Sequence, residues 1–136
     1  MSFRPYLFFA GACREAFTRY HEIFGGDLDI SRFGDAPPDS MPPGGDPDMV
    51  MHAALTVGDH LLMGSDDPTD SFDGIRGVMV SHTAADVAEA DRIFAALADG
   101  GEVVMPLTEV FWSPRFGMCV DRFGARWMVD VAPAEA

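Results

Sequence analysis

A histidine in the first half of the chain is the first residue whose type and setting suggest chemistry. His52 lies in the stretch VMHAALTV at 50–57, whose alternating pattern predicts a strand. An imidazole with an ordinary pKa near ~6.5 can act as a general base or as a hydrogen-bond donor to a ligand. The alternative is a polar side chain that is hydrogen-bonded within the sheet, and the sequence leaves both open.

A second candidate is an acid beside two aromatic residues. Glu109 shortly precedes Phe111 and Trp112, in a segment that we expect to be a loop between strands. A carboxylate that aromatic neighbours desolvate has a raised pKa and can act as a general base. Otherwise Glu109 is a solvated loop residue, as most acids are. Phe111 and Trp112 are expected either to wall a site for an apolar or cationic small molecule, or to pack in a dimer interface.

The last predicted strand brings further polar groups onto one face. Arg126 could bind a ligand carboxylate in a bidentate manner, or pair with Asp130 on the same face. Trp127 alternates with Arg126, so we expect it in the core. Cys119 is expected to face the binding side, but it has no identifiable cationic neighbour that would lower its pKa, which argues against a nucleophile.

Composition excludes several classes of function. The 136 residues carry 9 Lys+Arg, all of them arginine, against 22 Asp+Glu, for a net charge of −13. A nucleic-acid partner is therefore not expected, whereas a cationic ligand would be attracted. Two cysteines and no CxxC motif provide neither a disulfide framework nor a zinc site. No apolar run approaches the ~18 residues of a membrane span and the start lacks a signal-peptide pattern, so we expect a soluble cytoplasmic protein without membrane contact.

The expected elements occur as the same series twice: strand, helix and three strands. Glycine pairs follow both helices, and hairpins at Gly58 and Gly124 match each other. Between the second and third strands, residues 34–49 form a Pro- and Gly-rich loop whose role the sequence leaves open. Strands are predicted at 3–9, 27–33, 50–57, 60–65, 76–82, 102–107, 116–121 and 125–131, and helices at 12–24 and at 84–98, the latter capped by Thr83.

This order predicts an α+β fold made of duplicated βαβββ modules. The modules span approximately 1–66 and 74–133 of a single domain, 1–136. Because neither module is large enough to bury its sheet alone, we expect them to share one core.

Three segments resemble a known family: PYLFF at 5–9, AFTRYHEIFGG at 16–26 and FWSPRFGMCVDRFGARWMV at 111–129. They are similar to the PhnB-like branch of the vicinal oxygen chelate superfamily, which includes glyoxalase, bleomycin-resistance and dioxygenase proteins. The resemblance implies a curved mixed sheet around a cleft, and a homodimer. The label 3-demethylubiquinone 3-methyltransferase has been attached to such sequences, but this chain has no Gly-rich nucleotide loop that would support it.

The resemblance also indicates where metal-dependent members hold their ion, on four strands. In this chain those places fall on Pro5, Ala54, residues 76–80 and Met128, none of which is a ligand. His52 shares a face with Ala54, and Asp130 shares one with Met128, so only two of the four strands could offer a donor. We therefore expect neither a metal nor another cofactor.

These observations favour a metal-free small-molecule-binding protein, with no reaction assigned. One alternative is a metal-dependent glyoxalase-type lyase or isomerase, or a dioxygenase; another is sequestration of a cationic drug. Whether the chain is an enzyme, and what its ligand is, stay open, with His52 and Glu109 as the catalytic candidates. The expected ligand-binding residues are His52, Glu109, Phe111, Trp112, Arg126 and Met128.

Overall fold

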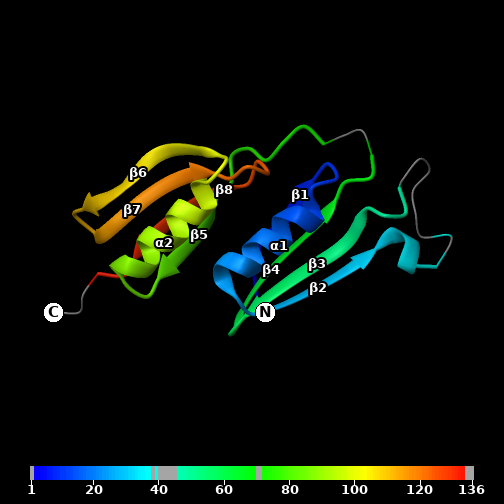
Figure 1. Cartoon of the computed structure of the whole chain (residues 1–136), viewed down its shortest axis with the longest axis horizontal. Coiled ribbons are helices and arrows are strands. Elements are labelled where there is room, and N and C mark those ends of the chain that lie inside the picture. Colours follow the sequence, from blue (N-terminus) through cyan, green and yellow to red (C-terminus); the bar gives the residue numbers. More distant parts are fainter. Residues whose placement is uncertain (1, 38, 40–45, 70–71, 134–136) are drawn as a thin grey trace. The chain divides into compact units, whose positions relative to one another are not determined.

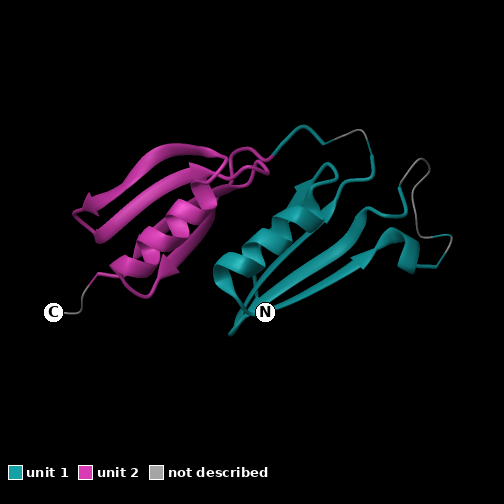
Figure 2. Cartoon of the chain, in the orientation of Figure 1, with its two compact units in different colours: residues 1–74 teal, residues 75–136 magenta. Residues whose placement is uncertain are grey.

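The fold repeats one unit of helix and sheet. The computed structural model describes residues 2–37, 39, 46–69 and 72–133, and the chain divides into two compact units, Met1–Gly74 and Ile75–Ala136 (Figure 2). Each unit contains a four-stranded mixed sheet with one helix lying over one of its faces (Figure 1). The α+β class and the duplicated βαβββ order are thereby confirmed.

Both units have the same topology. In each sheet the first strand of the unit pairs in parallel with the last, and the remaining pairs are antiparallel. The first unit has the order β1-β4-β3-β2 and the second β5-β8-β7-β6. The elements are β1 (Tyr6–Phe9), α1 (Cys13–Phe24), β2 (Asp27–Arg32), the 3₁₀ turn η1 (Phe33–Asp35), β3 (Val50–Val57), β4 (His60–Asp66), β5 (Val80–Ala84), α2 (Val87–Ala98), β6 (Glu102–Val110), β7 (Ser113–Val120) and β8 (Arg126–Val131).

Helix α1 packs through an apolar stripe onto its sheet. Its Ala16, Phe17 and Tyr20 are fully buried at the spacing of one helical face. The sheet meets this stripe with Gly64, where an added Cβ would lie 2.6 Å from the Phe17 ring and 2.7 Å from the carbonyl oxygen of Leu7. Glycine therefore lets the helix approach β4 closely.

A buried carboxylate joins three segments of the first unit. Asp66, at the end of β4, accepts hydrogen bonds from the backbone N–H groups of Gly11 and Cys13 on one oxygen and of Val50 on the other. Only 2% of its surface is exposed. These bonds satisfy donors at the start of α1 and of β3 that would otherwise be buried without partners.

The second unit uses a comparable carboxylate at a turn. Asp121, which follows β7, accepts from the N–H groups of Phe123 and Ala125 and from the indole N–H of Trp127. Trp127 is 2% exposed, which confirms its predicted place in the core. The carboxylate thus fixes the β7–β8 turn and provides the acceptor that the buried indole N–H needs.

Several sequence-based expectations for the second unit were wrong. Thr83 does not cap α2 but lies in β5, and the helix begins at Val87, where Asp86 accepts from the N–H of Glu89. The strand expected at 76–82 starts only at Val80. Cys119 is fully buried and pairs across the sheet with Trp127, on the side that faces α2 rather than the binding side.

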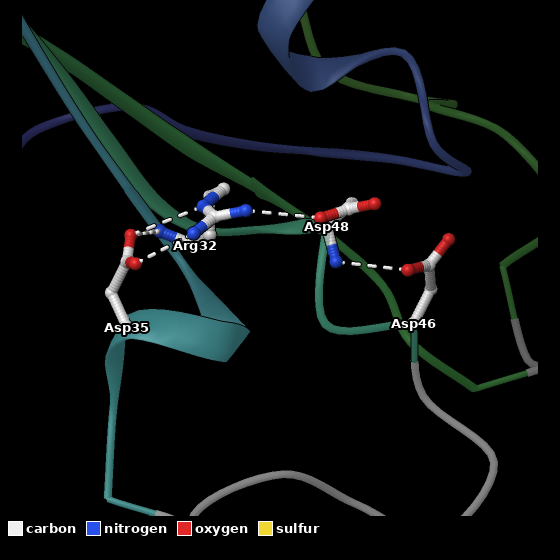
Figure 3. A network of polar contacts seen from close by, with 4 residues as sticks. All are labelled: Arg32, Asp35, Asp46 and Asp48. Atoms are coloured by element: carbon white, nitrogen blue, oxygen red, sulfur yellow. Dashed lines mark hydrogen bonds and ion pairs between the residues drawn. The ribbon is translucent and has the colours of Figure 1, made fainter.

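The two ends of the connection between β2 and β3 are fastened together (Figure 3). Arg32 donates to the carboxylates of Asp35 and Asp48, and Asp46 accepts from the backbone N–H of Asp48. Two backbone hydrogen bonds continue the strand pairing beyond the end of β2. The N–H of Phe33 donates to the carbonyl oxygen of Met49, and the N–H of Gly34 donates to that of Pro47. Part of the predicted 34–49 loop lies outside the described residues. Within the described part of the chain, no helix is long and apolar enough to cross a membrane.

Candidate functional site

In the first unit, aromatic side chains gather on the face of the sheet opposite α1, which we call the first helix-free face. Along β1, Leu7 and Phe9 are buried toward the helix, so Tyr6 and Phe8 take the other side, where they are 38% and 48% exposed. Their rings are 5.2 Å apart between centroids. Large exposed apolar side chains at one place on a sheet are typical of a binding surface.

His52 joins this aromatic pair from β3. Its Nδ1 lies 3.1 Å from the hydroxyl oxygen of Tyr6, and the ring centroids are 5.7 Å apart. A neutral imidazole that accepts the Tyr6 hydroxyl proton at Nδ1 carries its own hydrogen at Nε2, which makes Nε2 a donor. The contact is with a side chain of another strand, and it favours this tautomer when the Tyr6 hydroxyl is the donor.

In the second unit, the face opposite α2, the second helix-free face, is lined by alternate residues of β8. Arg126, Met128 and Asp130 are half-buried, whereas the residues between them are buried toward the helix. Across the sheet, Met128 pairs with Met118 and Asp130 with Phe116. This face therefore combines flexible apolar side chains with two opposite charges.

An aromatic cluster continues this face at the turn between β6 and β7. The rings of Phe111 and Trp112 are 4.7 Å apart between centroids, and those of Trp112 and Phe116 are 5.3 Å apart. Phe111 is 96% exposed and Trp112 44% exposed. Trp112 is thus held against a residue of β7, whereas Phe111 is almost wholly in solvent.

Arg126 and Asp130 do not form the ion pair considered from the sequence. Arg126 donates through Nε to the carbonyl oxygen of Ile75 at 3.3 Å, and no ion pair links it to Asp130 within the described residues. The Oδ1 atom of Asp130 is buried and has no hydrogen-bond partner in the described part of the chain. An unsatisfied buried acceptor of this kind costs about 1–3 kcal/mol.

Glu109 lies in β6 rather than in a loop, because that strand extends to Val110. Its side chain is exposed, so the desolvation on which a base at this position would depend is not what the structure shows.

The two cysteines are poor nucleophiles. Burial and the nearby Asp66 carboxylate raise the pKa of the Cys13 thiol to about 12, and burial together with Asp121 raises the pKa of Cys119 to about 11. Both thiols therefore stay protonated near neutral pH, in agreement with the expectation for Cys119.

Comparison with known proteins identifies the family. The model of the family described as 3-demethylubiquinone-9 3-methyltransferase matches residues 1–130. The chain belongs to this family. Protein YjdN of Escherichia coli (strain K12) is 33% identical over 141 residues, which cover 96% of this chain and 95% of YjdN.

Solved structures agree with this family and extend the likeness of fold beyond it. Protein PA1353 from Pseudomonas aeruginosa is 46% identical with a TM-score of 0.89, covering 97% of this chain and 98% of its own. The PhnB protein from Bacillus cereus is 26% identical with a TM-score of 0.79, covering 97% and 100%. A glyoxalase-related enzyme from Fulvimarina pelagi, 14% identical with a TM-score of 0.60 and coverage of 100% and 94%, shares the fold alone. The chain is thus similar to a PhnB protein and shares its fold with a glyoxalase-related enzyme.

The described residues of this PhnB-like chain do not fit the four-strand metal site that the resemblance to the vicinal oxygen chelate superfamily implies. Within the described residues, no group of three or more His, Cys, Asp or Glu side chains could hold a metal ion. Pro5 precedes β1, Ala54 and Met128 offer no ligating oxygen or nitrogen, and residues 76–79 lie ahead of β5. A metal centre needs about three or four converging donors. The described residues do not bring that many together.

The structure groups the predicted site residues of this family member by unit. In the first unit it joins His52 to Tyr6 and Phe8, which the sequence reasoning treated only as part of a motif. In the second it places Trp112 near Phe116, on the face that carries Arg126 and Met128. Alternation along FRPYLFF, with an amphipathic tyrosine out of phase with the buried residues, was the available signal for Tyr6.

Proposed function

We propose that this PhnB-like protein binds a small, largely apolar molecule without a metal ion. The observation that carries the proposal is the exposure of aromatic rings on the helix-free faces of both units. Tyr6 and Phe8 keep 38% and 48% of their surface exposed and Trp112 keeps 44%, although each is fixed by a neighbouring ring. Ligand sites are typically lined by such apolar side chains with a few polar groups.

On each of the two faces, taken by itself, polar groups are available to orient a bound ligand. On the first helix-free face, Nε2 of His52 can donate to a ligand when Nδ1 accepts from the Tyr6 hydroxyl. On the second, Arg126 adds a guanidinium and Met128 an adaptable apolar surface. None of these groups is arranged with a partner as a nucleophile and base, so we propose binding rather than a reaction.

The family description names a methyltransferase, but we do not extend that activity to this chain. The folds that typically bind nucleotide-containing cofactors have a mostly parallel sheet with a Gly-rich loop after the first strand. Both sheets here are four-stranded and mixed, and a single glycine, Gly11, stands between β1 and α1.

The binding proposal is tested with N-phenyl-1-naphthylamine, an uncharged dye that fluoresces in apolar sites. We expect saturable binding to the native chain, weakened about tenfold by Tyr6→Ala or by Trp112→Ala, which corresponds to about 1.4 kcal/mol. Phe3→Ala is the matched control, because Phe3 is 95% exposed and precedes β1. No binding by the native chain, or equal affinity in all variants, would overturn the proposal.

The metal-free part of the proposal has its own test. Protein purified without chelator and without a His tag is incubated with Mn²⁺, Fe²⁺, Ni²⁺ or Zn²⁺, dialysed, and analysed for metal. We expect far less than one ion per chain. A stoichiometric ion that survives dialysis would instead favour a metal-dependent lyase, isomerase or dioxygenase.

We further propose that the protein is a cytoplasmic homodimer. The support is the family resemblance, together with the edge strand β6, on which Val103 and Val104 are 48% and 50% exposed. Edge strands with exposed apolar residues are prone to be covered by another chain. Light scattering after gel filtration should give twice the 14.7 kDa of one chain, and a concentration-independent value of 14.7 kDa would contradict it.

A further inference from the structure

One acidic group of the second helix-free face lacks a partner among the described residues. The Oδ1 atom of Asp130 is buried and makes no hydrogen bond with them, although the residue as a whole is only half-buried. Asp130 pairs in the sheet with Thr83 of β5 on one side and with Phe116 of β7 on the other. The carboxylate is therefore partly desolvated, lies beside an aromatic residue, and has no hydrogen-bond donor for Oδ1 among the described residues.

The one cation on this stretch of β8 is engaged elsewhere. Arg126 lies on the same face as Asp130, four positions earlier, but its Nε donates to the carbonyl oxygen of Ile75. No ion pair within the described residues involves Asp130. A buried carboxylate oxygen is strongly favoured to receive a hydrogen bond, and a charged donor provides the largest gain.

Aromatic surface lies next to this carboxylate. The ring of Phe116, the cross-strand neighbour of Asp130, contacts the ring of Trp112 at 5.3 Å between centroids. The faces of tryptophan and phenylalanine rings attract cations, and they also bind apolar groups. A carboxylate and two such rings complement a flat molecule that carries a positive charge.

We propose that Asp130 anchors the positive group of an organic cation whose apolar part lies against Phe116 and Trp112. This inference rests on the proposed binding function and adds the class of ligand to it. An anionic ligand would meet the unpaired charge of Asp130 and a chain with a net charge of −13. A bare metal ion would lack the further donors it needs, because no cluster of three ligating side chains occurs within the described residues.

Two probes with the same heavy atoms test the charge alone. The 1-methylquinolinium ion is a permanent cation, whereas 4-methylquinoline has nearly the same size and the same ring system and is uncharged above neutral pH. Their affinities for the native chain are measured by calorimetry. Binding at the face is located by the indole N–H signals in NMR spectra, since the chain has two tryptophans and Trp127 is 2% exposed against 44% for Trp112.

We expect the cation to bind the native chain at least about tenfold more tightly than the neutral probe, with a shift of the Trp112 signal only. In Asp130→Asn this preference should disappear. Glu102→Gln is the matched control, because it removes the same charge from an exposed position of β6 in the same sheet. The preference should persist there.

Each other outcome has a distinct meaning. Equal affinities for the two quinoline probes would overturn the role of Asp130 while leaving the proposed function in place, provided that N-phenyl-1-naphthylamine still binds. Failure of all three probes would overturn both. Loss of the preference in Glu102→Gln as well would assign it to the overall negative charge and overturn the anchor. If Asp130→Asn does not fold, equal affinities of the native chain for the two probes would still overturn the anchor, and the Glu102→Gln variant would still test the effect of overall charge.

Discussion

The hydroxyl of Tyr6 lies 3.1 Å from Nδ1 of His52, although 46 positions separate the two residues. The pairing of strands brings them together, because β4 lies between β1 and β3 and pairs with both. Met63 of β4 is the direct cross-strand partner of Tyr6 and also of Ala54, which shares a face with His52. Tyr6 and His52 are therefore diagonal neighbours across β4, because His52 lies two residues before the position on β3 that is level with Tyr6.

This contact predicts a change of tautomer in Tyr6→Phe. Loss of the hydroxyl removes the partner that keeps hydrogen away from Nδ1 of His52, so the two neutral tautomers should become more equally populated. The ¹⁵N shifts of the ring report this directly, and those of the exposed His60 serve as an internal control. The free energy of unfolding should fall by no more than about 1 kcal/mol, because the bond is exposed. Unchanged ¹⁵N shifts at His52 would show that the contact does not set its tautomer.

Asp66→Ala should destabilise the chain strongly. The substitution leaves the N–H groups of Gly11, Cys13 and Val50 without their acceptor in a buried place. The expected loss of unfolding free energy is about 3 kcal/mol or more, measured by urea denaturation. Asp59→Ala is the control, since Asp59 is an exposed acid in the β3–β4 turn and should change the free energy by less than about 0.5 kcal/mol. A similar loss in both variants would assign the effect to net charge.

The thiols should react only after unfolding. Because burial and a nearby carboxylate raise the pKa of Cys13 to about 12 and of Cys119 to about 11, iodoacetamide at mildly alkaline pH should label neither in the native chain and both in denaturant. Mass spectrometry of the alkylated protein counts the labels. Rapid labelling of the native chain at either thiol would contradict the prediction.

The raised pKa values of the two thiols also make the free energy of unfolding depend on pH. A thiol whose pKa is higher in the folded state keeps its proton there while the unfolded chain loses its own, so stability is present below the ordinary thiol pKa and falls as pH rises toward 11 to 12. Cys119→Ala should reduce this alkaline loss. An identical slope of unfolding free energy with pH in the variant would exclude Cys119 as a contributor.

The secondary structure and the duplication could be predicted from the sequence because they follow local patterns. Alternation identified β3 at 50–57 without error, and Trp127 was placed in the core by the same rule. The boundaries that failed lie where side chains compete for backbone groups. Asp86 rather than Thr83 caps α2, since its carboxylate reaches the N–H of Glu89.

The site was less accessible from the sequence, because its relationships are long-range. Alternation puts Arg126, Met128 and Asp130 on one face, but it cannot show that the carbonyl of Ile75 engages Arg126 and leaves Asp130 without a partner. Nor does it bring Tyr6 to His52, which requires the strand order. Bulges in the β6–β7 pairing also interrupt the two-residue alternation by which a strand is recognised in a sequence. The strand β6 extends through Glu109, a residue that the sequence places in a loop.

Arg32 sets the titration of Asp35 at the base of the β2–β3 connection. The guanidinium donates to both oxygens of the carboxylate and the backbone N–H of Arg32 adds a third bond, which together lower the pKa of Asp35 below its ordinary value (Figure 3). Since the pKa is lower in the folded state, the stability from this contact is present above the ordinary pKa and is lost as pH falls through the folded one.

Arg32→Gln should therefore raise the pKa of Asp35 part of the way to its ordinary value, because the backbone donor stays while the charged side chain is lost. Titration of the carboxyl carbon by ¹³C NMR measures this shift. Arg4→Gln removes the same charge from an exposed position before β1 and should leave Asp35 unchanged. Both residues are exposed, so the ion pair should weaken with salt and contribute little to overall stability. If Asp35 titrates identically in Arg32→Gln and in the native chain, the side-chain contact is not the cause of its low pKa. The joined ends of this connection would then depend on the backbone bonds of Phe33 and Gly34.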